Sequence, residues 1–166
     1  MDDELWFYYI GFQGDAARLG PRHNGMYANA STGIAKLRRD GFASMWAGEN
    51  ERTLLTRPVT FSGKHLFANV NAPAGELRAA VTNLAGNPLP PFTFDNCRAV
   101  RADTTRQEIT WEGAEDLSAL AGQPLRFRFY LTNGSFYAFW TSDDKTGRSG
   151  GYVAAGGPGF DNGRDE

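Results

Sequence analysis

Residues 125–142, LRFRFYLTNGSFYAFWTS, contain the clearest strand pattern of the chain. Between Leu125 and Leu131 apolar side chains alternate with arginine or tyrosine, and a period of two is typical of a strand whose two faces differ. Asn133-Gly134 follows, a pair that favours a type I′ turn because both central residues of that turn adopt positive φ. We therefore predict a β-hairpin in which strand 125–131 pairs with the residues after Gly134.

The two faces of this predicted hairpin differ in chemistry. In the expected register Leu131 faces Phe136 and Phe127 faces Trp140, so one face is apolar and should enter the core together with Trp140. The other face combines aromatic and basic side chains, and we take it as the candidate ligand-binding surface. Its residues are Tyr130, Tyr137, Phe139, Arg126 and Arg128.

The rest of the chain has the pattern of an all-β protein. Its 166 residues suit one domain, and 13% aromatic residues with 20 glycines and 8 prolines fit many strands joined by turns. Short alternating segments recur about every ten residues, which predicts an antiparallel β-sandwich. The alternation places the following side chains in its core: Leu66, Ala68, Val70, Leu77, Ala79, Val81, Ile109 and Trp111.

The ends of the chain have a different character. LWFYYIGF within residues 4–12 predicts a first strand, and a long polar connection over 13–32 precedes a short second strand at 33–37. Residues 42–47 are expected to continue as strand, and the Gly-rich end predicts a last short strand over 152–160. We expect an N-terminal strand segment over 1–40, a sandwich domain over 41–155 and a flexible tail over 156–166.

Charge and special residues exclude several classes of function. The net charge is −2 and the arginines are scattered, so no nucleic-acid partner is predicted. The N-terminal apolar run is short and has acidic flanks, which excludes a signal peptide or a membrane-spanning helix there and predicts a fragment of a longer protein. Cys97 is alone and predicted to be a partly buried apolar side chain, while His23 and His65 are expected at the surface.

Five segments, taken in order, suggest a family. GIAKLRRDGFASM, LLTRPVTFSGKHLFANVNAPAGELRAAV, FTFDNC, TTRQEITW and DLSALAGQPLRFRFYLTNGSFYAFW resemble the C-terminal β-sandwich that follows the five-bladed propeller of invertase- and fructanase-type glycosidases. The resemblance covers roughly residues 33–142, and residues 4–12 resemble an outer strand of the last propeller blade. It implies a jelly-roll or concanavalin-like accessory domain of a secreted bacterial glycoside hydrolase. In that family the catalytic acids lie in the propeller, which has no counterpart here, so the activity does not carry over.

No catalytic residue is assigned. Glycoside hydrolysis needs two carboxylates around one bond, one of them held protonated by its surroundings. The closely spaced acids all fall in predicted turns or loops, where solvated carboxylates are expected, and no GxSxG elbow is present. These acids are Glu49 with Glu51, Asp95 with Asp103, Glu112 with Glu115 and Asp116, and Asp143 with Asp144.

A structural calcium ion is the one cofactor that the sequence suggests. Loop carboxylates and carbonyls bind calcium in many proteins, although the chain has no spaced calcium-loop motif. The candidate ligands are Asp95, Asp103, Asp143 and Asp144.

Two hypotheses for the aromatic and basic surface stay open. A polysaccharide or oligosaccharide can stack its C–H faces on aromatic rings while polar side chains bind its hydroxyls. Alternatively, the same surface packs against a parent propeller or a second copy of the chain, as exposed apolar patches often do. Further candidates for glycan contact are Trp46, Trp111 and Tyr152, and Trp111 is weaker than Trp46 because its parity places it in the core.

Overall fold

The computed structural model describes residues 3–15, 17, 25, 27–151 and 164. The chain divides into two compact units, Met1–Phe42 and Ala43–Glu166. The strand expected over 152–160, the candidate Tyr152 and all of the expected tail except Arg164 lie outside the described residues. No helix in the described ranges is long and apolar enough to span a membrane.

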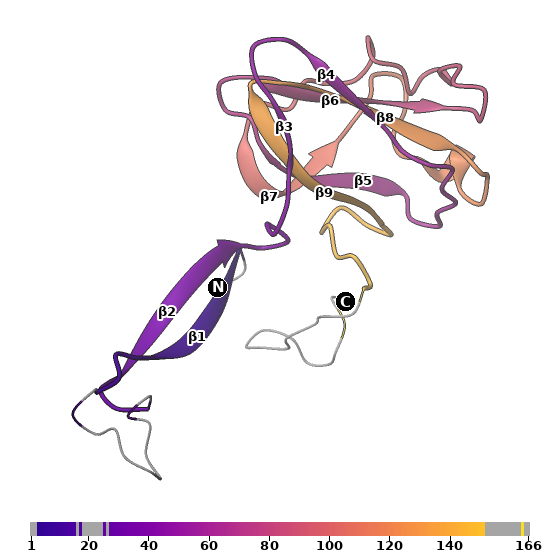
Figure 1. Cartoon of the computed structure of the whole chain (residues 1–166). Coiled ribbons are helices and arrows are strands. Elements are labelled where there is room, and N and C mark those ends of the chain that lie inside the picture. The colour runs from indigo at the N-terminus through magenta and orange to yellow at the C-terminus, as the bar shows by residue number, and fades with distance from the viewer. Residues whose placement is uncertain (1–2, 16, 18–24, 26, 152–163, 165–166) are drawn as a thin grey trace. The chain divides into compact units, whose positions relative to one another are not determined.

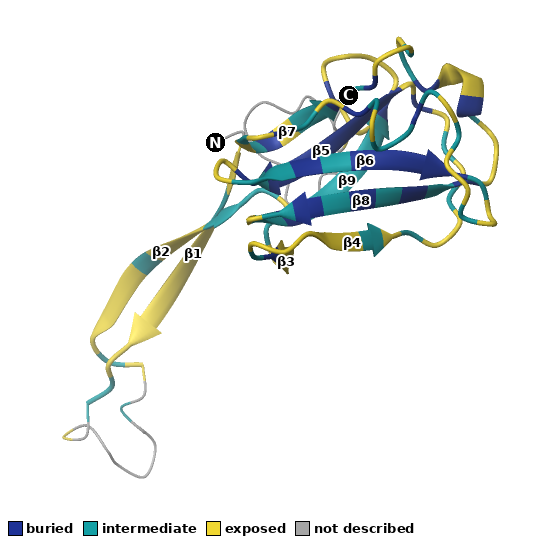
Figure 2. Ribbon diagram, turned by 90° about the horizontal axis from the view of Figure 1, so that it is seen from above, coloured by how far each residue is buried: buried dark blue, intermediate teal, exposed yellow. Residues whose placement is uncertain are grey.

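The first unit is a two-stranded antiparallel hairpin (Figure 1). β1 (Glu4–Phe12) pairs with β2 (Ala30–Arg38) over nine residues, from Glu4 opposite Arg38 to Phe12 opposite Ala30. β1 confirms the expected strand, whereas β2 begins three residues before and ends one residue after the expected 33–37, because the ladder runs from Ala30 to Arg38. Most side chains on both faces of the hairpin are exposed, as Figure 2 shows by its colour.

The second unit is a sandwich of two antiparallel sheets (Figures 1 and 2). The four-stranded sheet has the order β3-β9-β5-β7, and the three-stranded sheet has the order β4-β8-β6. The bounds are β3 (Met45–Ala47), β9 (Gly134–Ser142), β5 (His65–Asn71) and β7 (Asp103–Ile109), then β4 (Arg52–Leu55), β8 (Arg126–Thr132) and β6 (Glu76–Thr82). One turn of 3-10 helix, Ser118–Leu120, follows the loop after β7.

The core lies between the two sheets and confirms the alternation expected from the sequence. All eight side chains predicted to be buried are buried, from Leu66 on β5 to Trp111 after β7. Trp111 also donates its indole N–H to the Ala79 carbonyl at 2.9 Å, which satisfies its polar atom inside the core. Cys97 is buried, as its apolar interpretation required, and burial raises the pKa of its thiol.

The predicted hairpin of residues 125–142 is wrong. β8 pairs with β4 and β6, whereas β9 pairs with β3 and β5, so the chain changes sheets at Asn133. Asn133 has a φ of 43° and its N–H donates to the Gly48 carbonyl at 2.8 Å. The physical reason is burial: Phe129 on β8 contacts Phe136 across the core, with ring centroids 4.6 Å apart, so both apolar faces are covered by each other.

A β-bulge reverses the expected side-chain directions in β9. Asn69 pairs with Ala138 but Val70 pairs with Phe136, so Tyr137 is the extra residue in the β5–β9 ladder. After the bulge Phe139 packs against the core, although it was expected on the outer face. Trp140 was expected in the core and lies on the outer side instead, where it stacks on Phe67 at 5.8 Å and donates to the Gly147 carbonyl at 2.8 Å.

Candidate functional site

The predicted binding residues lie on both sheets of the sandwich and do not form one surface. Arg126, Arg128 and Tyr130 share the outer face of the three-stranded sheet, because the residues between them on β8 are buried. Tyr137 and Phe139 belong to the other sheet, and Phe139 faces the core. Trp46 lies on the edge strand β3 of that other sheet and is 73% exposed. We call the surface formed by Arg78, Phe94, Arg126, Arg128 and Tyr130 the β8 face.

Two aromatic rings meet on the β8 face. Phe94 packs against Tyr130 edge to face, with centroids 4.7 Å apart and an interplanar angle of 71°. Phe94 comes from the turn that follows Phe92. The Cys97 N–H donates to the Thr93 carbonyl at 3.1 Å in that turn, and the Asn96 side-chain amide donates to the Pro91 carbonyl at 2.9 Å. These bonds hold Phe94 against the sheet, and both rings remain partly exposed.

One end of the β8 face carries a compact ion-pair network. The Arg78 guanidinium lies 5.3 Å from the Phe94 centroid and donates to the Cys97 carbonyl at 2.7 Å and to Glu76 at 2.9 Å. Arg101 donates to the second oxygen of Glu76 at 2.6 Å. The hydrogen bond from Arg78 is the main cause that lowers the pKa of Glu76, with Arg101 adding to it. Glu76 is therefore ionised and fully engaged.

Among the described residues, the other arginines of the β8 face have no acidic partner. Arg128 lies opposite Ala80 on β6 and Leu55 on β4, and Arg126 lies opposite Thr82. Within the described part of the chain neither guanidinium is in a hydrogen bond or ion pair, and the Nε atom of Arg126 is buried without a partner. Glu76 is the only acid in β4, β6 and β8, whereas these strands carry four arginines: Arg52, Arg78, Arg126 and Arg128.

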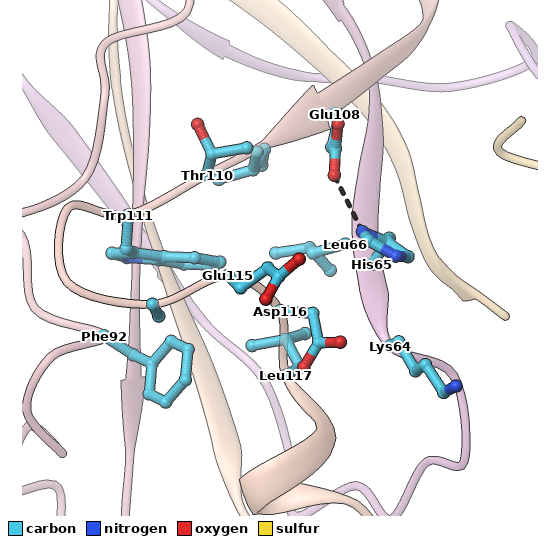
Figure 3. Close-up of a pocket in the computed structure, with 12 residues that line it drawn as sticks. Lys64, His65, Leu66, Phe92, Glu108, Thr110, Trp111, Glu115, Asp116 and Leu117 are labelled. Carbon is cyan, nitrogen blue, oxygen red and sulfur yellow. Dashed lines mark hydrogen bonds and ion pairs between the residues drawn. The ribbon is translucent and has the colours of Figure 1, made fainter. Parts of the chain in front are cut away.

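A second feature is a small pocket at one end of the sandwich, shown in Figure 3. His65 and Glu108 meet there, with Nδ1 and Oε1 2.8 Å apart. Glu115 and Asp116 line the same pocket, and Trp111 with other apolar side chains forms its walls. The surface position expected for His65 is wrong: only 9% of it is exposed, because it begins β5 and is covered by Glu108 from the neighbouring strand β7.

The pocket lacks the parts of a nucleophilic site. Ser142 lies directly opposite His65 in the β5–β9 ladder, yet only 3% of it is exposed and no hydrogen bond joins its hydroxyl to His65 within the described residues. Instead, hydrogen bonds beside the pocket hold the loop of residues 116–118 next to Lys64. The Leu117 N–H donates to the Lys64 carbonyl at 2.7 Å, and the Ser118 N–H donates to Asp116 at 2.8 Å, which lowers the pKa of Asp116.

Sequence reasoning missed the His65–Glu108 contact. These two residues are 43 positions apart and follow no recognisable spacing. Only the pairing of β5 with β7 brings them together, and that pairing is a property of the tertiary structure.

Asp95 lies in a turn, Asp103 begins β7, and Asp143 and Asp144 lie in the bend after β9. No group of three or more His, Cys, Asp or Glu side chains among the described residues is close enough to hold a metal ion. Asp144 accepts hydrogen bonds from the backbone and hydroxyl of Thr146, which lower its pKa and stabilise the turn after β9. The calcium site stays a prediction, because backbone carbonyls can supply part of its ligands.

The β1–β2 hairpin is a third candidate surface. Large apolar side chains extend from both of its faces, and Tyr8 is 70% exposed. Within the described residues of this unit the sheet has two strands and no second layer, and an isolated two-stranded hairpin is marginally stable. The exposed large apolar residues of this unit are Phe7, Tyr8, Tyr9, Ile10, Phe12, Tyr27, Ile34 and Phe42.

No protein-family model, no curated protein and no solved structure matches the chain. A functional conclusion therefore rests on the three surfaces described above.

Proposed function

We propose that this chain is a non-catalytic β-sandwich module that binds a glycan on the β8 face. The observation that carries the proposal is the Tyr130–Phe94 pair, two partly exposed rings held at 4.7 Å on a rigid sheet. An aromatic ring binds the C–H face of a sugar by apolar contact, while a few polar groups around it select the hydroxyl pattern. Arg126 and Arg128 supply such donors beside Tyr130.

The rigidity of the β8 face supports this function. Tyr130 lies on β8, the middle strand of its sheet, with Thr53 on one side and Arg78 on the other. Phe94 is held by the hydrogen bonds of its turn and by the Arg78 guanidinium. A binding surface that is already ordered loses little conformational entropy when its ligand binds.

We extend the proposal to the parent protein by the family resemblance. The module is a jelly-roll-type accessory domain of a secreted glycoside hydrolase, and residues 4–12 are a strand of a neighbouring propeller blade.

Affinity electrophoresis against a panel of soluble polysaccharides tests the function. We expect retardation in at least one gel, and loss of that retardation in Tyr130→Ala, because the substitution removes the ring on which the sugar stacks. The control is Trp46→Ala, which removes an exposed ring from the edge of the other sheet. Retardation by none of the polysaccharides contradicts glycan binding, and loss only in Trp46→Ala moves the site away from the β8 face.

A second function is favoured by the β1–β2 hairpin. Its aromatic faces and its two strand edges, which pair with no further strand among the described residues, match an interaction module that packs against a parent propeller or self-associates. Sizing chromatography tests self-association: we expect a dimer that Ile10→Ser returns to a monomer. A wild-type chain that elutes as a monomer at every concentration contradicts self-association.

A further inference from the structure

We infer that the glycan of the β8 face is acidic and carries carboxylate groups on its sugar rings. This inference rests on the proposed function and adds the chemical class of the ligand. It is carried by the charge of the β8 face, which differs from that of the whole chain.

The charge balance of the three-stranded sheet is the first argument. The chain as a whole has a net charge of −2. The outer face of β6 and β8 nevertheless holds three arginines and a single acid, Glu76. Both oxygens of Glu76 are engaged, one by Arg78 and the other by Arg101. The charges of Arg126 and Arg128 are therefore not compensated by this acid, and an anionic ligand complements them.

The position of the two arginines that have no partner in the described part of the chain is the second argument. Arg126 and Arg128 are two residues apart on one face of β8, so their Cα atoms are separated by about 6.7 Å along the strand. Like charges this close repel each other, and a bound anion between them relieves the repulsion. Tyr130 is the next residue on the same face, so a sugar ring stacked on it places a ring carboxylate toward Arg128.

The planar guanidinium of Arg128 is the third argument. It is partly exposed and makes no hydrogen bond or ion pair with the described residues, whereas the Nε atom of Arg126 is buried beyond the reach of a ligand. Nε and one Nη of a guanidinium form the planar edge that binds a carboxylate through two parallel hydrogen bonds. A carboxylate matches this planar geometry, which is why we assign a uronate rather than a sulfate ester.

The test compares polygalacturonate with its fully methyl-esterified form, because the two share a backbone and differ in charge. We expect the wild-type chain to bind polygalacturonate at least about tenfold more tightly at low salt, as the loss of a charge-assisted hydrogen bond implies. We also expect the affinity to fall as salt is added, since the arginines are partly exposed.

Variants locate the effect. Arg128→Gln should weaken polygalacturonate binding about tenfold and leave binding of the ester unchanged, because it removes one ion pair. Arg128→Lys keeps the charge but loses the planar donor edge, so we expect an intermediate loss. Arg148→Gln is the matched control, because it removes the same charge from an exposed position after β9. Thermal unfolding of each variant verifies that it is folded.

The outcomes separate the inference from the proposed function. Equal affinity for polygalacturonate and its ester overturns the inference and leaves glycan binding in place. Binding to neither of these and to no polysaccharide of the panel overturns both. Tighter binding of dextran sulfate than of polygalacturonate overturns the carboxylate assignment. Equal binding of polyglutamate, unaffected by Tyr130→Ala, overturns the glycan in favour of an acidic protein partner.

Discussion

The β1–β2 hairpin and the β8–β9 segment are both rich in aromatic residues, yet the rings of the hairpin are largely exposed and those of β8 that face the core are buried. Phe127 and Phe129 on β8 are almost completely buried, and they contact aromatic rings of β9 across the sandwich. Tyr8 and Tyr9 on β1 are more than half exposed. The difference teaches that an aromatic strand is buried by the second layer above it and not by its own composition. Within each unit, this contrast predicts where a substitution affects folding and where it affects binding.

The largest effect is expected in the core of the sandwich. Phe129→Ala should lower the free energy of unfolding by about 3–5 kcal/mol, because it removes a fully buried ring that contacts several others. Urea unfolding followed by near-ultraviolet circular dichroism measures the change. A loss below about 1 kcal/mol would mean that the two sheets are not packed as described.

A smaller effect is expected at the pocket that joins β5 to β7. His65→Ala should destabilise the sandwich by about 1–3 kcal/mol, because it leaves the carboxylate of Glu108 without its partner. The same urea titration applies. Glu108→Gln is the control, since an amide oxygen still accepts a hydrogen bond from the imidazole, and it should lose less than half as much. Equal stability of His65→Ala and wild type contradicts a structural role for the pocket.

The ion-pair network of the β8 face predicts a dependence of stability on pH. The folded-state pKa of Glu76 lies below the unfolded value of 4.5, so on acidification the unfolded chain takes up its proton first. The stabilisation is complete above that value and is lost as the pH falls through the folded pKa. Its size should be about 1 kcal/mol or less, since the pair is partly exposed.

Glu76→Gln tests that dependence. The variant should be less stable than wild type at neutral pH and should approach it under acid conditions, where Glu76 of the wild type is protonated. Melting temperatures of both proteins across the acid range provide the measurement. A constant difference at every pH would rule out the charge of Glu76 as the cause.

The smallest effect is expected in the hairpin. Tyr8→Ala should change the free energy of unfolding of the sandwich by no more than about 0.5 kcal/mol, because its side chain is 70% exposed. Tyr8→Phe is the matched control. A change as large as that of Phe129→Ala would show that the exposed ring contributes to the fold, and it would remove the contrast between the two regions.

The bulge in β9 explains why the predicted side-chain directions of Phe139 and Trp140 were wrong. Strict alternation through residues 134–142 places Phe139 outside and Trp140 inside, but Tyr137 is an extra residue that reverses both. Phe127, Phe129 and Leu131 on β8 follow the alternation without interruption, so their burial was predicted correctly. Arg126, Arg128 and Tyr130 were assigned to an outer face for the same reason.

The strands, their faces and most of the core follow from local sequence, because alternation and turn residues act over a few positions. The partners of each strand do not. Asn133-Gly134 has the residues of a hairpin turn, yet the strands beside it join different sheets, because burying both apolar faces against each other excludes more water than pairing them side by side. The pairing of Phe94 with Tyr130 and of His65 with Glu108 likewise depends on contacts between distant segments, so only the tertiary structure decided them.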